Sequence, residues 1–208
     1  MTDPADLTDP AETMGIAAVI VAAGAGRRLG GVAKALLPHR GQSYLAAIAA
    51  TARTVGLVDA VVVVGEPFGQ EVAAHARQLG LRVRVNPAPD RGMASSVALG
   101  FAALGSGPAG AAWLWPVDHP AVTEATLRRL ALAIGQAEVV QPRYLGRGGH
   151  PPLCRRTLWP QLAACAGPTS SARGARGVLR AARLVAVDVD DPGVVRDVDT
   201  PADLEASA

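Results

Sequence analysis

The sequence is poor in the residues and patterns that mark several large classes of protein. Aromatic residues make up 3% of the 208 residues, so the chain offers no obvious cluster of aromatic anchors for a protein interface. Its two cysteines, Cys154 and Cys165, are too few for a metal cluster and form no CxxC motif, so we expect buried or incidental thiols. No hydrophobic run approaches the ~20 residues of a membrane span.

The chain also carries no large excess of positive or negative charge. The net charge is +2 at pH 7, and arginines are interspersed with acidic residues, which gives no electrostatic reason to expect nucleic acid or a membrane as partner. Residues 1–14 are rich in Asp, Pro and Thr and lack the basic start and apolar core of a signal peptide, so we predict a flexible tail and a cytoplasmic protein. Residues 15–208 are predicted to form one domain.

Short runs rich in Val and Ala alternate with stretches of helical period along this domain. This alternation predicts an α/β fold, a single Rossmann-like three-layer domain with a mainly parallel sheet. Strands are expected at residues 16–23, 60–64, 81–85, 111–117, 139–142 and 183–189. Helices are expected at 43–55, 69–78, 95–104 and 155–164, with others starting at Thr123 and Thr200, and the stretch 173–182 is expected to be irregular.

Lys34 is the only lysine in the chain, and it closes a glycine-rich loop that follows the first expected strand. A compact ammonium beside glycines and two arginines suits a phosphate ligand, and small residues let backbone N–H groups face an anion. Gly24, Gly26 and Gly30 are spaced G-x-G-x-x-x-G, not as a dinucleotide fingerprint, and no G-K-[ST] follows, which disfavours an oxidoreductase or a P-loop NTPase. A tight turn with solvated arginines is the structural alternative.

Carboxylates follow two further strands. Asp118 ends an apolar strand directly before a proline turn, where it would either ligate Mg²⁺ near a polyphosphate or only cap the turn. His119 beside it is expected to be solvated. Asp197 and Asp199 alternate along a short strand and therefore point to opposite faces, so at most one of them reaches the same metal as Asp118.

Five motifs in order resemble the MobA-like nucleotidyltransferases, and among them most closely the molybdenum cofactor cytidylyltransferases. The motifs are Ala-Ala-Gly-x-Gly-x-Arg-Leu-Gly-x3-Lys at 22–34, Arg-Gly-Met-Ala-Ser-Ser at 91–96, Asp-His-Pro at 118–120, Gly-Gly-His-Pro at 148–151 and Asp-Val-Asp-Thr-Pro-Ala-Asp-Leu at 197–204. The interval from Arg28 to Lys34 is one residue longer than is commonest in the family. It leaves open whether Lys34 contacts the leaving pyrophosphate or the acceptor phosphate.

The resemblance implies a Mg²⁺-dependent transfer of CMP from CTP to the phosphate of a molybdopterin-type cofactor, with release of pyrophosphate. Arg28, Lys34 and Asp118 would be catalytic, with Arg28 and Lys34 on the polyphosphate and Asp118 on the metal. Asp197 or Asp199 would occupy the second acidic position near that ion.

The resemblance also implies which residues bind the two substrates. The residues expected at the nucleotide, besides Arg28 and Lys34, are Ala22, Ala23, Gly24, Ala25, Gly26, Ser95 and Ser96. The two serines would contact the nucleotide or the acceptor phosphate, or would instead only cap a helix. Arg147 and His150 would lie towards the acceptor.

Two other functions remain open at this point. One is a related transfer from another nucleoside triphosphate to a sugar phosphate or polyol phosphate. The other is a non-catalytic nucleotide- or cofactor-binding partner of a molybdenum enzyme. The Ala-Ala-Gly start of the loop resembles the cytidylyl-transferring members, which favours CTP. The expected partners are small-molecule substrates, with handover of product to a molybdenum enzyme or its chaperone.

Overall fold

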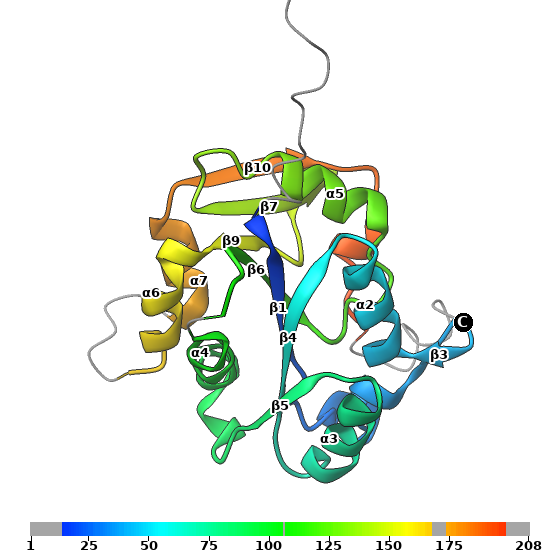
Figure 1. Cartoon of the computed structure of the whole chain (residues 1–208). Helices are drawn as coiled ribbons and strands as arrows, with labels where there is room; N and C mark the ends of the chain where they lie inside the picture. The colour runs from blue at the N-terminus through cyan, green and yellow to red at the C-terminus, as the bar shows by residue number, and fades with distance from the viewer. Residues whose placement is uncertain (1–13, 106, 168–173, 199–208) are drawn as a thin grey trace, which may run out of the picture.

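The central sheet of the protein is mainly parallel and lies between two layers of helices (Figure 1). The computed structural model describes residues 14–105, 107–167 and 174–198. The strands are β1 (Ile16–Val21), β4 (Leu57–Val64), β5 (Arg82–Val85), β6 (Ala111–Pro116), β7 (Val139–Tyr144), β8 (Arg147–Gly148), β9 (Leu153–Arg155) and β10 (Leu184–Asp188). Their order is β10-β7-β9-β6-β1-β4-β5, with β8 paired to β7. The three-layer α/β prediction is confirmed.

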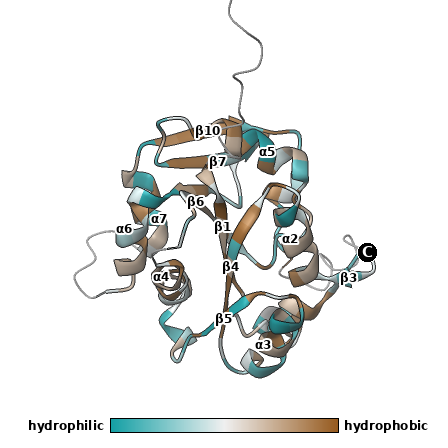
Figure 2. Cartoon of the chain, viewed as in Figure 1, coloured by the Kyte–Doolittle hydropathy of each residue, from teal (hydrophilic) through white to brown (hydrophobic). Residues whose placement is uncertain are grey.

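Helices cover both faces of this sheet, as Figure 1 shows. On one face lie α2 (Tyr44–Arg53), α3 (Gly69–Gln78) and α5 (Glu124–Leu132), and on the other lie α4 (Met93–Leu104), α6 (Trp159–Ala164) and α7 (Gly174–Ala181). Each face has its own apolar core, one including Ile48 and Leu127 and the other including Phe101 and Trp159. In Figure 2 the brown colour that marks hydrophobic residues is concentrated on the central strands. The two cores therefore hold the strand ends in fixed positions relative to the helices.

Short elements complete the described chain. A two-stranded antiparallel hairpin is formed by β2 (Pro38–His39) and β3 (Gln42–Ser43). The 3₁₀ turns are η1 (Arg27–Leu29), η2 (Lys34–Leu36), η3 (Pro89–Arg91), η4 (Arg156–Leu158) and η5 (Pro192–Val194).

Local sequence signals explain where the regular elements begin. The central strand β1 is apolar on both faces and fully buried from Ile16 to Ile20, as expected of a parallel strand covered by helices on each side. Ser43 caps α2, because its hydroxyl accepts a hydrogen bond from the Ala46 amide at 3.0 Å. Thr123 caps α5 in the same way, although its hydroxyl is 3.4 Å from the Thr126 amide.

The structure corrects the expected bounds of several elements between residues 93 and 182. Helix α4 begins at Met93 and not at residue 95, with Gly92 as its N-cap. The helix expected from residue 155 begins later, because Leu153–Arg155 is a strand that pairs antiparallel with both β6 and β7. The stretch expected to be irregular contains helix α7, whose Val178 is buried against the second core.

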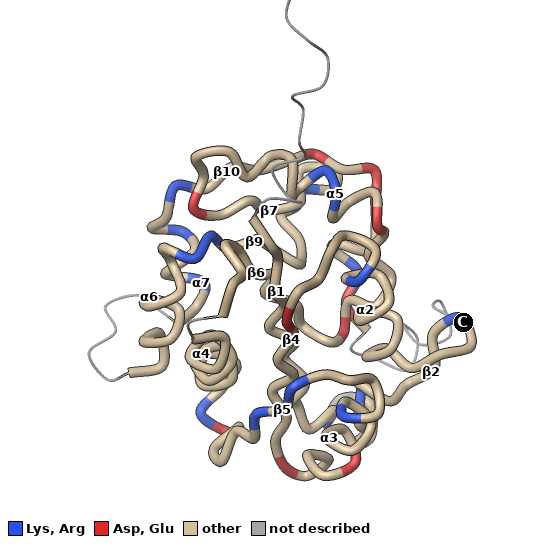
Figure 3. Tube along the Cα trace, in the orientation of Figure 1, with Lys and Arg blue, Asp and Glu red and all other residues tan. Residues whose placement is uncertain are grey.

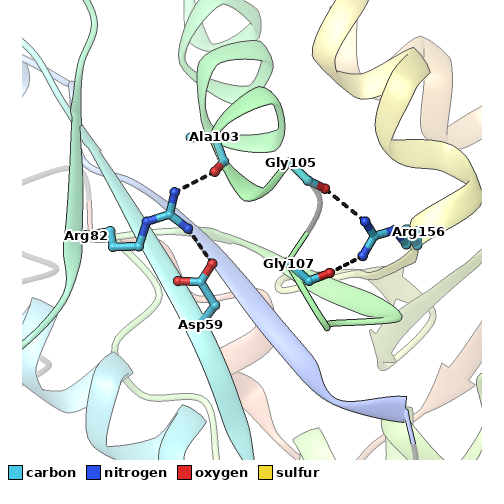
Figure 4. Close-up of polar contacts among 6 residues, drawn as sticks. All are labelled: Asp59, Arg82, Ala103, Gly105, Gly107 and Arg156. Carbon is cyan, nitrogen blue, oxygen red and sulfur yellow. Dashed lines mark hydrogen bonds and ion pairs between the residues drawn. The ribbon is translucent and has the colours of Figure 1, made fainter.

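Two arginines hold the C-terminal end of α4 (Figure 4). Arg82 donates to the Ala103 carbonyl at 2.7 Å and pairs with Asp59. Arg156 donates to the carbonyls of Gly105 and Gly107 and lies 5.2 Å from the centre of the Trp159 ring. Cationic groups on the carbonyls at a helix C-terminus are favourable, so α4 is anchored where it ends.

Charged residues of both signs are distributed around the periphery of the fold (Figure 3). Within the described ranges, no helix combines the length and hydropathy needed to cross a membrane. Cys154 and Cys165 are both buried and unpaired, which confirms the reading of them as buried thiols. Residues 1–13, Asp199 and the helix start expected at Thr200 lie outside the described residues, so those expectations remain predictions.

Candidate active site

A cavity of about 350 Å³ lies where the carboxyl ends of β1 and β6 meet the N-terminal end of α4. This is the edge at which parallel α/β sheets bind their ligands. The cavity is lined by Val21, Ala22, Ala23, Gly24, Gly26, Arg27, Lys34, Pro89, Gly92, Met93, Ser96, Pro116, Val117 and Asp118. The structure therefore brings the glycine loop, Lys34, Ser96 and Asp118 to one place, as the sequence predicts.

The glycine loop folds back on itself at Gly26. This residue has a φ of +57°, and a Cβ placed on it would lie 2.1 Å from the Val32 carbonyl oxygen. Only glycine fits such a close approach of backbone to backbone. Gly30 and Gly31 also have positive φ, and their amides donate to the carbonyls of Arg27 and Gly26. The two adjacent glycines thus accommodate the extra length of the loop before Lys34.

Lys34 lies directly against Asp118. Its Nζ is 3.4 Å from the Asp118 Oδ2, and the two side chains are 14% and 23% exposed. The second carboxylate oxygen of Asp118, Oδ1, is buried and has no hydrogen-bond partner among the described residues. Among the described residues, the Asp118 side chain accepts no hydrogen bond from a backbone amide, so capping of the turn does not explain it.

Of the two arginines in the glycine loop, the structure describes the side chain of Arg27 but not that of the predicted Arg28. The side chain of Arg28 lies outside the described part of the structure. Arg27, which the sequence reasoning passed over, lines the cavity, and its Nη2 lies 3.4 Å from the Asp90 Oδ1. Both of those side chains are more than four-fifths exposed, so this pair contributes little to stability.

Ser95 and Ser96 are not helix caps. They follow the N-cap Gly92 by three and four residues, and both are buried. Asn86, which is 2% exposed, donates through its Nδ2 to Ser95 Oγ at 2.8 Å and to Ser96 Oγ at 2.9 Å. Asn86 Oδ1 also accepts from the Ala88 amide at 2.9 Å. This buried amide holds the start of α4 and the hydroxyl of Ser96 against the cavity.

Asn86 was missed by the sequence reasoning because an Asn-Pro pair reads as an ordinary turn signal. The available clue was its position, since it directly follows a strand of a parallel sheet.

A second cavity, of about 270 Å³, adjoins the first and shares Met93, Pro116 and Asp118 with it. The residues that line only this second cavity are His119, Arg147, Gly148, Gly149, His150, Val194, Val195 and Asp197. The structure thus places both predicted acceptor residues, Arg147 and His150, in one hollow. Asp118 is the carboxylate that faces both cavities.

His119 is not solvated as expected, because it is 6% exposed. Its Nδ1 lies 3.3 Å from the Gly193 carbonyl, and its ring centre is 5.1 Å from that of His150. Its Nε2 is 3.8 Å from Asp118 Oδ1, close enough for charges to interact but too long for a hydrogen bond. Burial, followed by the neighbouring His119, lowers the pKa of His150 to about 4, so His150 is neutral at physiological pH.

The donor set around Asp118 fits a divalent cation. A buried carboxylate oxygen without a partner is costly unless something positive binds it, and carboxylate oxygens are the ligands that Mg²⁺ prefers. Asp197 is exposed and lines the second cavity with Asp118, whereas Asp199 lies outside the described residues. The described residues include no cluster of three or more metal-binding side chains. Mg²⁺ commonly uses one or two carboxylates and completes its shell with water and substrate phosphates, so such a cluster is not required.

A glycine loop, a lysine and a carboxylate lie around one cavity, with a second cavity beside the carboxylate, an arrangement that suits an enzyme acting on a polyphosphate and a second substrate. The sequence profile of the MobA-like NTP transferase domain matches residues 18–187. The chain therefore belongs to the MobA-like NTP transferase family, and it is a nucleotidyltransferase-type enzyme.

Individual relatives extend over nearly the whole chain. Nicotine blue oxidoreductase of Paenarthrobacter nicotinovorans is 34% identical over 195 residues, which cover 89% of this chain and 92% of that protein. The crystal structure of Rv0371c from Mycobacterium tuberculosis H37Rv is 31% identical, with a TM-score of 0.70 and coverage of 93% and 97% of the two chains. Another structure of Rv0371c, at 29% identity, a TM-score of 0.65 and the same coverage, is a complex with manganese.

A nucleotidyl transferase from Methanothermobacter has the same fold, with a TM-score of 0.74 at 24% identity. The alignment covers 93% of this chain and 96% of that one.

Proposed function

We propose that this protein transfers CMP from CTP to the phosphate of a molybdopterin-type cofactor and releases pyrophosphate, with Mg²⁺ as the metal ion. The observation that carries the proposal is the pair of adjoining cavities with Asp118 at their junction. A nucleotide in the first cavity and a phosphorylated acceptor in the second would meet at this carboxylate. CTP and the pterin acceptor are supported by the order of the five motifs and by the Ala-Ala-Gly start of the loop.

The reaction forms a bond between an oxygen of the acceptor phosphate and the α-phosphorus of the nucleotide. The bond from the α-phosphorus to the oxygen bridging to the β-phosphate breaks, and that oxygen leaves with pyrophosphate. An acceptor phosphate is already an anion at neutral pH, so the protein needs no general base and no covalent nucleophile. Its task is to align two anions and to offset the charge that grows on the leaving group.

The residues of the first cavity suit this task. The loop from Ala22 to Gly26 would bind the base and phosphates through backbone N–H groups, and Lys34 would place a positive charge beside the reacting phosphates. Asp118, with Asp197 or Asp199, would hold Mg²⁺, which when bound supplies further positive charge to the phosphate oxygens. Arg28 is proposed to act with Lys34 on the polyphosphate.

The second cavity would bind the acceptor. Arg147 offers a fork of donors that suits a phosphate, and neutral His150 adds a polar wall without a further charge. The finished dinucleotide would then pass to a molybdenum enzyme or its chaperone.

A nucleotide panel tests the proposal. Binding of CTP, GTP, ATP and UTP is measured by calorimetry with Mg²⁺, and pyrophosphate release is measured with molybdopterin. We expect CTP to bind and to turn over, and Asp118→Asn to lower turnover by about two to three orders of magnitude. Turnover with GTP or ATP but not CTP would refute the cytidylyl assignment, and turnover only with a sugar or polyol phosphate would refute the pterin acceptor.

One relative favours a second candidate, since a protein 34% identical to this chain is named nicotine blue oxidoreductase. The glycine spacing of the loop is not that of a dinucleotide fingerprint, which weighs against a similar activity here. Oxidation of NADH or NADPH by the purified protein in the presence of nicotine blue distinguishes the two. Oxidation that survives Asp118→Asn while pyrophosphate release is absent would favour the redox function.

A further inference from the structure

The turn η5 contacts two parts of the second cavity through its backbone carbonyls. The carbonyl of Gly193 faces His119 Nδ1 at 3.3 Å, and because a carbonyl only accepts, this ring nitrogen is the donor. The carbonyl of Val194 accepts from the His150 amide at 2.7 Å. Just beyond the turn, the Val198 amide donates to the Asp118 carbonyl at 3.3 Å. A shift of this turn would therefore move both histidines.

Close backbone contacts on both sides restrict the movement of η5. A Cβ on Gly193 would lie 2.6 Å from the Ala121 carbonyl oxygen, and a Cβ on Gly149 would lie 2.3 Å from the Val194 carbonyl oxygen. Backbone is thus packed on backbone at both sides of η5, towards the segment after β6 and towards the loop that carries His150.

Asp191 fixes this turn from the side away from the cavities. It is 3% exposed and lines neither cavity. Its Oδ1 accepts from the Gly193 amide at 2.9 Å. Its Oδ2 accepts from the Thr123 amide and hydroxyl, both at 2.9 Å, and from the Thr126 hydroxyl at 2.7 Å. With four donors this buried carboxylate is fully satisfied, and it ties η5 to the start of α5.

We propose that Asp191 is a positioning residue that holds His119 and His150 in place at the second cavity through the turn η5. The consequence for catalysis rests on the proposed function, because there the second cavity binds the phosphorylated acceptor. The effect of Asp191 is then selective, since the turn that it holds bonds to His119 and to the His150 amide beside the second cavity, and not to the glycine loop.

The test compares Asp191→Asn with Thr126→Val. The asparagine keeps the size of the side chain but loses its charge, and in either orientation its NH₂ group replaces an acceptor oxygen, so at least one of the four donors loses its acceptor. Thr126→Val removes one of the four donors and keeps the shape of the side chain. Asp59→Asn is the control, because Asp59 is a carboxylate bound to Arg82 far from both cavities.

The first measurement uses the imidazole signals of the four histidines in an NMR spectrum of the isotopically labelled protein. In Asp191→Asn the signals of His119 and His150 should shift, and those of His39 and His75 should stay. Thr126→Val should shift the same two signals by less, and Asp59→Asn should leave them unchanged. Unchanged His119 and His150 signals in both folded variants would overturn the proposal, as would an equal shift of all four.

The second measurement is steady-state kinetics with CTP and molybdopterin. Asp191→Asn should raise KM for the acceptor by about ten- to a hundredfold while kcat and the dissociation constant of CTP change by less than about threefold. A purely structural role would weaken CTP binding and acceptor binding alike, and that result would overturn the proposal. If Asp191→Asn does not fold, Thr126→Val decides by the same criteria. If the wild-type protein does not turn over these substrates, the proposed function fails, and the histidine signals still decide the role of Asp191.

Discussion

Replacing Lys34 by methionine removes the positive charge at the centre of the candidate site with little change in side-chain length. The Lys34 Nζ and Asp118 Oδ2 are 3.4 Å apart. With an effective dielectric constant of about 20, Coulomb's law gives a gross attraction of about 5 kcal/mol at this distance. Partial burial removes water from both groups, and this desolvation offsets most of that attraction. The net loss of folding stability should therefore be about 1 kcal/mol, a fall in Tm of about 2–4 °C.

The effect on catalysis should be much larger than the effect on stability. The charge of Lys34 would act on phosphates whose negative charge grows during the reaction, and loss of one such fixed donor typically lowers kcat by about two to three orders of magnitude. Lys34→Arg should recover only part of this rate, since a planar guanidinium does not fit the place of a compact ammonium that is 14% exposed.

The assay is pyrophosphate release from Mg²⁺-CTP in the presence of the acceptor, with thermal unfolding measured on the same samples. Arg77→Met is the matched control, because it removes one exposed positive charge from helix α3 and should leave the rate unchanged. A Lys34→Met variant that retains its fold and works within about threefold of the wild-type rate would refute the reasoning.

Two further predictions concern buried groups. Asn86→Ala should lower the free energy of unfolding, measured in urea, by about 2–3 kcal/mol, because Ser96 loses its buried partner. The same variant should raise KM for the nucleotide. The control Gln78→Ala, at an exposed position, should change the free energy of unfolding by less than about 0.5 kcal/mol. Burial raises the pKa of Cys154 from 9.0 to about 12. Between these two pH values the unfolded chain therefore binds fewer protons than the folded chain. Stability should therefore fall more steeply between pH 9.0 and about 12 in the wild type than in Cys154→Ala, and Ellman's reagent should label this thiol only after denaturation.

Features that depend on residues close together in the sequence were predictable. The central strands β1 and β6 are continuous apolar runs. The glycines of the loop indicate a tight turn, and Gly26 does lie where a side chain would collide with Val32. The placement of Lys34 and Asp118 at one cavity followed from the rule that ligands bind at the carboxyl ends of parallel strands.

Features that depend on a distant partner were not predictable. His119 is buried because the turn at Gly193 covers it, and those residues are far apart in the chain. Strand β9 has three residues, too few for a period-two pattern to stand out, and its antiparallel place between β6 and β7 is set by pairing. The cap role considered for Ser95 was wrong because α4 begins earlier, with Gly92 as its N-cap, and the buried partner of Ser95, Asn86, comes from the end of another strand.

The same distinction explains why the two cavities differ in how well the sequence describes them. The first cavity is built largely from one continuous loop and the ends of two adjacent parallel strands, β1 and β6, so its residues carry a compact motif. The second is assembled from the turn after β6, the loop before β9 and the segment around η5, which meet partly through backbone hydrogen bonds such as that from His150 to Val194. Backbone contacts constrain side-chain identity only where a Cβ would collide, as at Gly149 and Gly193. Recognition at the second cavity, where we propose that the acceptor binds, would therefore be encoded more by the positions of these segments than by a run of characteristic residues.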